Sequence, residues 1–455
     1  MKTPTEHQFG AIKKVAYWYQ NDQQMEYSAE GNMLAPVLTF GGLAGTGKSA
    51  CLPNIVEQLK LHPEDVAFVA PTGKAAKVMN EKLRLDGVIT QTKTIHSAMY
   101  LPKALKAEVL EKRLKLCHDV LNGYGSEMIR EDDDTVYFEG SAITIKHLKE
   151  IIKITKHDLD KAYTVAEGPK FTFNVESKLF DKKLIIIDEA SMVGAEIARD
   201  LRSFGVPILA IGDPGQLPPV ADTAGFNIEN PDVFLTEIHR QAKDNPIIWL
   251  SMLARAGELL PLGTHSDKVR VIKRSQDNVS YDPDRDVQVI VGTNANRWRV
   301  TDKIRVALGY DSDAPMIGEK LICCRNSVTN PAVVNGTIVT VTGAPDELID
   351  GSDAFSIKYE DDEGIARHSL VYQGLFEEHK AKKRDHFTAD KREAFQSRKR
   401  NEHFDWAWAI TCHKSQGSSW PDVCVHDESG VFREDSAKWL YTAITRSSDI
   451  LTVVV

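Results

Sequence analysis

The sequence lacks any long hydrophobic run. No stretch of the 455 residues approaches the roughly 18 consecutive apolar residues that a membrane-spanning helix needs. The first residues, Met1–Gln8, are polar and contain no apolar core of a secretory signal. We therefore expect a cytoplasmic protein with no membrane partner.

Paired cysteines and an excess of positive charge are also missing. None of the six cysteines forms a C-x-x-C pair or stands at zinc-ligand spacing to a histidine, so we interpret them as reduced, mostly buried thiols. The net charge of −9 argues against a protein coated in nucleic acid, but it permits a local basic groove. There is no repeat, and the length suggests about two to four domains.

Short, nearly continuous apolar runs predict two parallel sheets covered by helices. The first set of runs is Val37–Phe40, Val66–Ala70, Leu184–Ile187 and Ile208–Ile211. The second set is Val287–Val291, Leu321–Cys324, Ala407–Thr411, Val423–Val425 and Leu451–Val455. The fold class is therefore α/β, and we expect ligands at the carboxyl ends of the strands.

Two segments interrupt this pattern. Residues Ala98–Lys182 are charged and mostly helical in character, and the alternating stretch Thr135–Thr144 within them predicts a hairpin. Residues 344–405 open with short β-like runs and continue into the charged helical stretch Glu377–Asn401. Both segments are expected to be insertions into the two core domains.

A glycine-rich segment directly follows the first strand. Residues Gly42–Ser49 match the phosphate-loop pattern G-x-x-x-x-G-K-[ST] between a strand and a helix. The residues expected at the nucleotide are Gly42, Ala44, Gly45, Thr46, Gly47, Lys48 and Ser49. Lys48 would neutralise β- and γ-phosphate charge, and the Ser49 hydroxyl would bind Mg²⁺. The alternative is a glycine-rich turn with a chance lysine.

Acidic and amide side chains follow two further strands. Asp188 and Glu189 end the run Leu184–Ile187, where Asp188 would hold Mg²⁺ and Glu189 would orient or deprotonate the attacking water. Gln216 follows the next strand and is placed to sense the γ-phosphate. An acidic helix cap and a Pro/Gly turn are the plainer interpretations of these segments.

Two arginines are candidates for completing the site. An arginine that reaches the γ-phosphate stabilises the charge of the transition state. Arg240 follows the first set of strands and Arg446 precedes the last strand of the second set. Taken alone, each could be an ordinary surface arginine. If Arg446 comes from the second sheet, hydrolysis depends on the closing of two domains.

The order of these segments resembles superfamily 1 helicases, in particular the 1B branch that contains the RecD and Dda helicases. The similar segments are Thr5–Gln8 (Q-motif), Gly42–Ser49 (I), Ala70–Ala76 (Ia) with Thr94–Ser97 after it, Asp188–Ser191 (II), Gly212–Pro219 (III), the Arg240 segment (IV), Thr411–Gly417 (V) and Tyr441–Arg446 (VI). The run Thr411–Gly417 resembles RecD and Dda most specifically. The resemblance spans nearly the whole chain.

The resemblance implies two RecA-like domains in tandem, with ATP and Mg²⁺ between them. It places Gln8 against the adenine and adds Gly417 to the nucleotide site. The expected domains are residues 1–97 and 181–255 (first RecA-like domain), 98–180 (insertion with the strand-separating pin), 256–345 and 406–455 (second RecA-like domain) and 346–405 (SH3-like insertion with a charged helical stretch).

The same resemblance implies a path for single-stranded DNA across the ends of both sheets. The residues expected there are Pro71, Thr72 and His96 in the first domain and Thr293, Asn294, Thr411, His413 and Lys414 in the second. Short polar groups at these positions can grip phosphates without reading sequence, and an imidazole can stack on a base. Helix capping by the threonines and asparagine is the competing interpretation.

The implied function is an ATP-dependent DNA helicase that moves 5′ to 3′ on single strands and opens duplexes at single-strand/duplex junctions. We expect a monomeric working unit in the cytoplasm of a bacterium or phage-infected host, serving replication, recombination or repair, with partners such as a single-strand-binding protein. An RNA-directed relative remains an alternative, because contacts to the 2′-hydroxyl cannot be read from sequence. A DNA-binding RecA-like scaffold without hydrolysis is a second alternative. The presence of the candidate catalytic residues argues against it, namely Lys48, Asp188, Glu189, Gln216 and Arg446.

Overall fold

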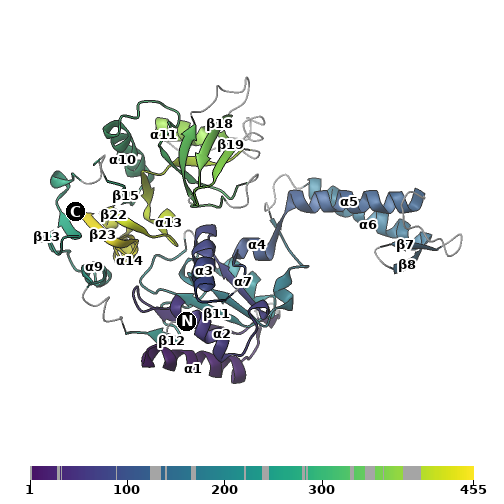
Figure 1. The fold of residues 1–455 in the computed structure, drawn as a ribbon. Helices are drawn as coiled ribbons and strands as arrows, with labels where there is room; N and C mark the ends of the chain where they lie inside the picture. Colours follow the sequence, from purple (N-terminus) through teal and green to yellow (C-terminus); the bar gives the residue numbers. More distant parts are fainter. Residues whose placement is uncertain are drawn as a thin grey trace. The chain divides into compact units, whose positions relative to one another are not determined.

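The computed structural model describes the chain except for residues 1–2, 28–30, 32, 89, 123–134, 139–140, 165–170, 220–221, 238–244, 279–281, 283–284, 328–332, 344–353, 362 and 383–400. The described residues form two compact units. One unit contains Met1–Ile95 and Leu179–Val455, and the other is His96–Lys178. The larger unit is drawn in Figure 1 with two parallel sheets and one antiparallel sheet.

The first sheet of the larger unit is parallel, and its four central strands confirm the first set of apolar runs. Its strands, in spatial order, are β12 (Val233–Leu235), β3 (Val37–Gly42), β11 (Ile208–Gly212), β10 (Leu184–Ile187), β4 (Val66–Ala70) and β5 (Lys93–Thr94). All four residues of β10 are buried, as expected for a strand with helices on both faces. The carboxyl ends of β3, β10 and β11 therefore lie at one edge.

Helices cover this sheet, and the apolar core lies between the helices and the strands. They are α1 (Glu6–Asn21), α2 (Leu52–Gln58), α3 (Gly73–Leu85) and α7 (Ala195–Arg202), and a short ribbon of β1 (Glu26–Tyr27) and β2 (Met33–Leu34) lies between α1 and β3 in the sequence. Ile12 and Val15 of α1 share one apolar cluster with Phe40 and Phe68 of the sheet. A capping box fixes the start of α1, because Thr5 and Gln8 bond to each other's backbone amides.

The helix after the phosphate loop is short and begins late. A 3-10 turn, Ser49–Cys51, comes first, and α2 begins only at Leu52. Pro53 therefore stands in the first turn, where its missing amide hydrogen leaves no helical bond unmade. The loop is thus joined to its helix through a tight turn rather than directly.

The second sheet is parallel apart from its edge strand. In spatial order it contains β13 (Gly263–Thr264), β14 (Val269–Ile272), β23 (Ser447–Val454), β22 (Trp420–His426), β15 (Gln288–Val291) and β21 (Ala409–Thr411). Its helices are α9 (Pro246–Arg255), α10 (Asn294–Ala307), α13 (Cys412–Ser415) and α14 (Ser436–Ile444). These elements confirm a second RecA-like core for every run of the second set but one.

The exception is Leu321–Cys324, which was expected in the second parallel sheet. It forms β16 (Lys320–Cys323) of a separate antiparallel sheet, with β17 (Ile338–Gly343) and β20 (Phe404–Trp406) as its neighbours. An apolar run does not show which strands will pair with it. The sheet thus extends to both sides of residue 346, where the expected insertion began.

The antiparallel sheet has five strands and its own apolar core. Its spatial order is β19 (Ala366–Tyr372), β18 (Ala354–Glu360), β17, β16 and β20, and α11 (Gly374–Ala381) follows β19. Phe376 of α11 lies edge-on to Trp406 of β20, with ring centroids 4.7 Å apart. The charged helical stretch expected over Glu377–Asn401 lies mostly outside the described residues.

Helix α9 belongs to the second core, although the sequence placed residues 181–255 in the first domain. Its residues Ile247, Leu250 and Ala254 are buried in the apolar cluster that contains Val271 and Val453 of the second sheet. The first core therefore ends before α9. The segment between the cores includes residues 238–244, which are not described.

The smaller unit is a helical hairpin with a β-hairpin. Its elements are α4 (Ile95–Met99), which starts one residue before the unit, β6 (Tyr100–Pro102), α5 (Lys103–Asn122), β7 (Thr135–Phe138), β8 (Ser141–Thr144), α6 (Ile145–Thr164) and β9 (Phe171–Phe173). Helices α5 and α6 lie side by side, with the hairpin β7–β8 at one end (Figure 1). Cys117, Val136 and Leu148 pack together. The hairpin predicted over Thr135–Thr144 is confirmed.

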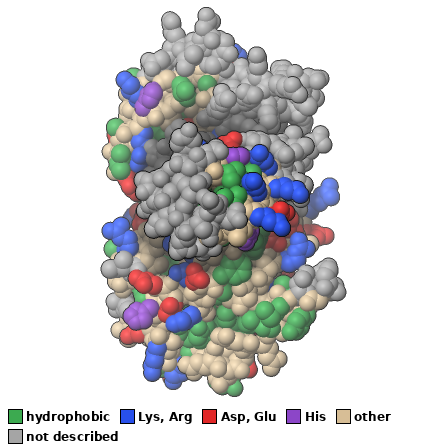
Figure 2. All heavy atoms as spheres, turned by 90° about the vertical axis from the view of Figure 1, so that its right-hand side faces the viewer, with side chains coloured by type: hydrophobic (Ala, Val, Ile, Leu, Met, Phe, Trp, Pro, Cys, Tyr) green, Lys and Arg blue, Asp and Glu red, His purple; other side chains and the backbone are tan. Residues whose placement is uncertain are grey.

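The surface carries mixed charge. On the face drawn in Figure 2, lysine and arginine side chains appear together with aspartate and glutamate side chains. Among the described residues, no helix combines the length and the apolar character needed to cross a membrane. A nucleic-acid path on such a surface depends on where individual cations lie and not on the net charge of −9.

Candidate nucleotide site

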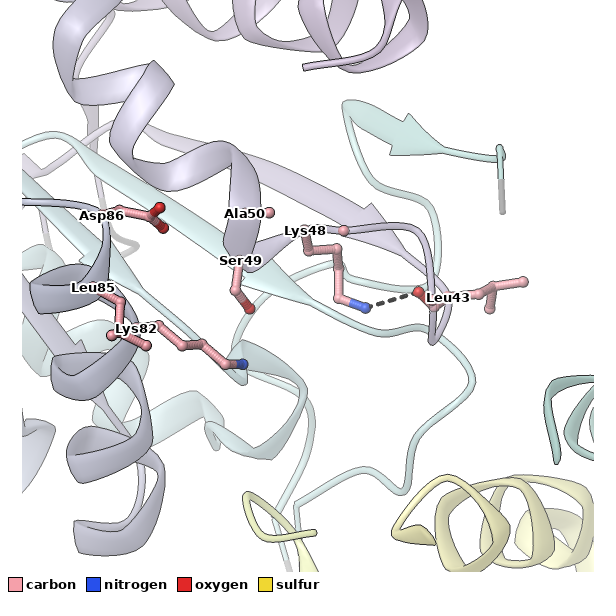
Figure 3. Close-up of a pocket in the computed structure, with 9 residues that line it drawn as sticks. Leu43, Lys48, Ser49, Ala50, Lys82, Leu85 and Asp86 are labelled. Atoms are coloured by element: carbon pink, nitrogen blue, oxygen red, sulfur yellow. Dashed lines mark hydrogen bonds between the residues drawn. The ribbon is translucent and has the colours of Figure 1, made fainter. Parts of the chain in front are cut away.

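The phosphate loop joins β3 to the 3-10 turn at Ser49. Gly45 and Gly47 have φ angles of 80° and 79°, a left-handed conformation that glycine adopts without strain. The Lys48 ammonium donates to the carbonyl oxygens of Gly42 at 2.6 Å and of Leu43 at 3.1 Å, the second bond being drawn in Figure 3. The loop thus curls around its own lysine and presents backbone amides to a ligand.

A pocket opens over this loop. It is lined by Leu43, Gly45, Gly47, Lys48, Ser49, Ala50, Lys82, Leu85 and Asp86 (Figure 3). The last three come from the C-terminal end of α3 and the residue after it. Sequence reasoning missed them, because no motif marks the end of that helix. Lys82 adds a second cation to the pocket that contains Lys48.

Two oxygen donors meet beside the loop. The Ser49 hydroxyl lies 3.3 Å from Oδ2 of Asp188, at the end of β10. Magnesium ligands stand about 2.0–2.1 Å from the ion in octahedral geometry, so neighbouring ligand oxygens are roughly 3 Å apart. A hydroxyl and a carboxylate oxygen at this separation fit a Mg²⁺ ion, and both residues were expected as its ligands.

Glu189 has an unusual backbone and a perturbed carboxyl group. Its φ and ψ are 56° and 38°, in the left-handed region that non-glycine residues rarely adopt and that is frequent at functional sites. Burial raises the pKa of its carboxyl group, and the Asp188 charge raises it further. The positive charges of Arg446 and Lys48 oppose these effects. Charged groups from both cores therefore influence the titration of this carboxyl group.

The end of β11 contributes two buried polar groups. Asp213 lies 3.5 Å from the Lys48 ammonium and is 2% exposed. Gln216 is also buried, and its Oε1 atom has no hydrogen-bond partner among the described residues. A buried polar atom without a partner is costly, so this amide oxygen is available to a water molecule or ligand. Gln216 was expected here, and Asp213 was not.

Arg446 comes from the second core. It follows α14 and is buried, and its guanidinium group donates to the carbonyl oxygens of Thr442 and Ser418 at 3.1 and 3.2 Å and to the Thr445 hydroxyl. Its charge is close enough to lower the pKa of Glu189. Arg240, the other expected arginine, lies outside the described residues.

Tyr441 is the functional-site residue that sequence reasoning missed most clearly. Its hydroxyl accepts a hydrogen bond from the Ala44 amide and donates one to Asp213, each at 2.8 Å. The residue begins the segment Tyr441–Arg446, so its place in a motif was the available signal. Nothing in the sequence showed which loop its hydroxyl reaches.

Gln8 and Gly417 were both expected at the nucleotide, and the structure shows which residues each of them contacts. The side-chain amide of Gln8 donates to the carbonyl oxygen of Thr46, which attaches α1 to the phosphate loop. Gly417 lies against α3 instead. A Cβ atom on it would stand 3.0 Å from Cβ of Ala75 and 3.2 Å from the Thr72 hydroxyl. The structure therefore groups Gly417 with the residues expected on DNA.

Most residues expected on DNA stand where strands of the two parallel sheets end. Thr72 caps α3 and Thr293 caps α10, so the capping interpretation of both is confirmed. Thr293 also donates to Glu428 at 3.1 Å. The remaining residues of this set in the larger unit are Pro71, Asn294, Thr411, His413 and Lys414, whereas His96 belongs to the smaller unit.

Burial distinguishes the two basic residues after β21. Half-buried His413 lies beside Phe432, with ring centroids 5.7 Å apart, and burial lowers the pKa of its imidazole. Lys414 is exposed, and its ammonium lies 3.0 Å from the sulfur of Cys324 on the antiparallel sheet. Burial therefore disfavours the charged form of His413, whereas Lys414 places an exposed ammonium at this edge.

Comparison with protein families gives two matches. Residues 26–222 match the family model of an AAA domain, and residues 406–454 match that of a UvrD-like helicase C-terminal domain. An uncharacterized protein of Methanocaldococcus jannaschii is 24% identical over 516 aligned positions, which cover 96% of this chain and 38% of that protein. The chain thus spans well under half the length of this curated relative.

Solved structures of Pif1 helicases are similar to nearly the whole of this chain. One, from a study of forked duplex unwinding by two coordinating Pif1 helicases, is 17% identical with a TM-score of 0.51, covering 99% of this chain and 92% of that chain. Pif1 helicase from Candida albicans is 20% identical with a TM-score of 0.46, covering 100% and 94%. The first of these similarities shows a shared fold.

A phosphate loop on one parallel sheet and an arginine from a second define a P-loop nucleotide-binding protein with two RecA-like cores and an antiparallel β insertion. The two matched family models correspond to these two cores in chain order. The ordered motifs, from Thr5–Gln8 to Tyr441–Arg446, fall largely within these two cores and resemble those of superfamily 1B helicases.

Proposed function

We propose that this chain is an ATP-dependent DNA helicase that moves 5′ to 3′ along single strands and unwinds duplexes. One observation carries the proposal: the Ala44 amide in the phosphate loop of the first core bonds at 2.8 Å to Tyr441 of α14 in the second core, the helix that Arg446 follows. Hydrolysis that requires groups from two cores depends on how the cores meet. Chemistry at the terminal phosphate is then coupled to movement.

The chain's residues have separate tasks in hydrolysis. Ser49 and Asp188 would hold Mg²⁺, which neutralises charge on the β- and γ-phosphates. Lys48 binds the same phosphates from the loop. The carboxylate of Glu189 accepts the proton of the attacking water, and Oε1 of Gln216 orients that water by accepting a hydrogen bond. Arg446 stabilises the charge that develops on the transferred group.

Strand movement needs DNA contacts on both cores. Gly417 of the second core lies against Thr72 and Ala75 of the first, beside the end of β4. Lys414, three residues before Gly417, offers a cation for a phosphate, and the backbone amides at the start of α3 offer neutral donors. A change in separation of the two cores would alter the spacing between these contacts and advance the strand.

The two insertions have distinct proposed tasks. The hairpin β7–β8 of the smaller unit is the candidate pin that separates strands, because Val136 and Phe138 anchor it to α6 through a local core. The five-stranded antiparallel sheet is the candidate SH3-like domain. The Pif1 structure whose fold the chain shares comes from a study of DNA unwinding at forked double-stranded DNA. We propose the same kind of substrate for this chain.

The decisive experiment compares ATP hydrolysis alone, with single-stranded DNA and with single-stranded RNA of the same sequence. The proposal expects strong stimulation by DNA and little by RNA. Equal or greater stimulation by RNA would favour the RNA-directed alternative. No hydrolysis under any of the three conditions would favour a scaffold that binds DNA without catalysis.

A further inference from the structure

Helix α14 places a tyrosine of the second core inside the phosphate loop of the first. The Tyr441 hydroxyl lies 2.8 Å from the Ala44 amide nitrogen and 2.8 Å from Oδ2 of Asp213. Its ring is fully buried and lies against Gly215, where an added Cβ would stand 2.8 Å from a ring carbon. Packing therefore holds the hydroxyl in one position.

The partners of this hydroxyl are groups that a nucleotide would also need. Ala44 is the third residue of the loop that cradles phosphates, and its amide donates to Tyr441. Oδ2 of Asp213 accepts from Tyr441 and also lies 3.5 Å from the Lys48 ammonium. Lys48 is the cation that reaches β- and γ-phosphates in such loops. A phosphate and the Tyr441–Asp213 pair thus require the same donors.

The position of the contact identifies the phosphate concerned. The terminal phosphate is the one that is cleaved, so it must lie beside the groups proposed for hydrolysis. The Lys48 ammonium lies 3.5 Å from Asp213, and the Tyr441 hydroxyl donates to the same carboxylate at 2.8 Å, so these three groups surround one small volume. Tyr441 faces this volume through Asp213. The β-phosphate, which ATP and ADP share, would be held by the loop amides nearer Lys48 and Ser49.

We propose that Tyr441 determines how the chain distinguishes ATP from ADP, because its hydroxyl competes with the γ-phosphate for the Ala44 amide. The inference rests on the proposed function. ATP displaces the hydroxyl from Ala44, and its negative charge displaces Asp213 from Lys48. ADP lacks the competing phosphate and leaves both contacts in place.

The exchange would pass the presence of the γ-phosphate to the second core. Tyr441 lies on α14, and Arg446 follows that helix by two residues. Release of the hydroxyl frees α14 from the loop at the moment when Arg446 is required near the terminal phosphate. Tyr441 is therefore a specificity-determining and positioning residue in this account and not a group that takes part in hydrolysis.

The test is the affinity of Tyr441→Phe for two nucleotides, measured by displacement of a fluorescent ADP derivative in the presence of Mg²⁺. Phenylalanine keeps the ring and removes only the competing hydroxyl. The non-hydrolysable analogue AMPPNP should bind about 2- to 10-fold more tightly than to wild type, the worth of one hydrogen bond. ADP affinity should stay within about 2-fold, an effect smaller than one such bond.

Thr442→Val is the matched control. The Thr442 hydroxyl accepts from the Leu217 amide at 3.0 Å, so its loss also removes a hydrogen bond between the two cores, but away from the phosphate loop. It should shift AMPPNP and ADP affinities equally. Thermal unfolding of both variants, with Tyr359→Phe as a buried tyrosine in the antiparallel sheet, verifies that they are folded.

Three outcomes would overturn the inference. Weaker AMPPNP binding by Tyr441→Phe would make the hydroxyl a ligand of the phosphate, and parallel shifts for both nucleotides would make it a simple packing contact. In either case wild-type hydrolysis of ATP leaves the proposed function intact. A wild-type chain that binds neither nucleotide would overturn the proposed function together with this inference.

Discussion

The hydroxyl of Tyr441 accepts a hydrogen bond from the backbone amide of Ala44 at 2.8 Å. These residues are 397 positions apart, one on the last helix of the second core and the other in the phosphate loop of the first. The phosphate loop, which lines the pocket, is therefore also a point of contact between the two cores. A ligand that alters the loop necessarily alters that contact, and the following expectations depend on this arrangement.

Lys48→Ala should lower DNA-stimulated ATP hydrolysis by about 10²–10³-fold, because one preorganised positive group at the phosphates is lost. Binding to single-stranded DNA, measured by fluorescence anisotropy with a labelled oligonucleotide, should remain. Lys14→Ala, a change of an exposed lysine on α1, is the control and should leave both properties unchanged. If Lys48→Ala lost DNA binding as well as hydrolysis, the assignment of Lys48 to the nucleotide phosphates would be contradicted.

Arg446→Ala should reduce the maximal rate of hydrolysis by about 10³-fold, since an arginine at the terminal phosphate acts mainly in the transition state. Nucleotide affinity should change much less. Arg199→Ala on the exposed side of α7 serves as the comparison. A large rise in KM with an unchanged kcat would show that Arg446 binds the ground state, and the two-core mechanism would then be wrong.

Ser49→Ala should raise the Mg²⁺ concentration that gives half-maximal hydrolysis by about 10-fold or more, because one ligand oxygen of the ion is removed. The measurement is an ATPase titration with MgCl₂ at fixed ATP. Ser203→Ala, at the exposed end of α7, should follow the wild-type titration. An unchanged Mg²⁺ requirement for Ser49→Ala would exclude this hydroxyl as a ligand.

Hydrolysis should decline with falling pH earlier than an ordinary glutamate would require. Burial raises the pKa of Glu189, and only its carboxylate form accepts a proton from water. The active form is therefore present above the raised pKa and is lost as the pH falls through it, starting above the usual value near 4.3. A pH–rate profile tests this expectation, with exposed Glu196→Gln as the control. A flat rate down to about pH 5, above that usual value, would contradict it.

A buried ion pair should stabilise the joint between the second core and the antiparallel sheet. Arg305 of α10 bonds to the fully buried carboxylate of Glu319 at 2.6 and 3.1 Å. Glu319→Ala leaves the arginine buried without its partner and should lower the free energy of unfolding by about 3–5 kcal/mol. Denaturant unfolding tests this value, and Lys380→Ala, which breaks an exposed pair with Asp313, should cost about 0–1 kcal/mol.

The strands of the first sheet and the phosphate loop could be predicted from the sequence because both are determined locally. A run such as Leu184–Ile187 is apolar over its full length only where helices cover both faces of a sheet. The loop requires glycines and a lysine at fixed spacing, so Gly45, Gly47 and Lys48 identify it without any distant contact.

Contacts between distant segments could not be predicted in the same way. The apolar run Leu321–Cys324 predicted a strand, but its pairing with β17 and β20 depends on partners far along the chain. The same limit applied to Tyr441, whose motif was evident while its bond to Ala44 was not. Gly417 was assigned to the nucleotide, yet packing sets it against α3.

The most direct test of the account is strand separation by the wild-type chain on duplexes with a 5′ or a 3′ single-stranded tail. With ATP and Mg²⁺, the account expects the 5′-tailed duplex to open and the 3′-tailed duplex to stay closed, and AMPPNP in place of ATP should prevent opening. Opening of the 3′-tailed duplex alone would contradict the direction of movement. Opening of either duplex with AMPPNP would contradict the central claim that hydrolysis between the two cores drives the strands apart.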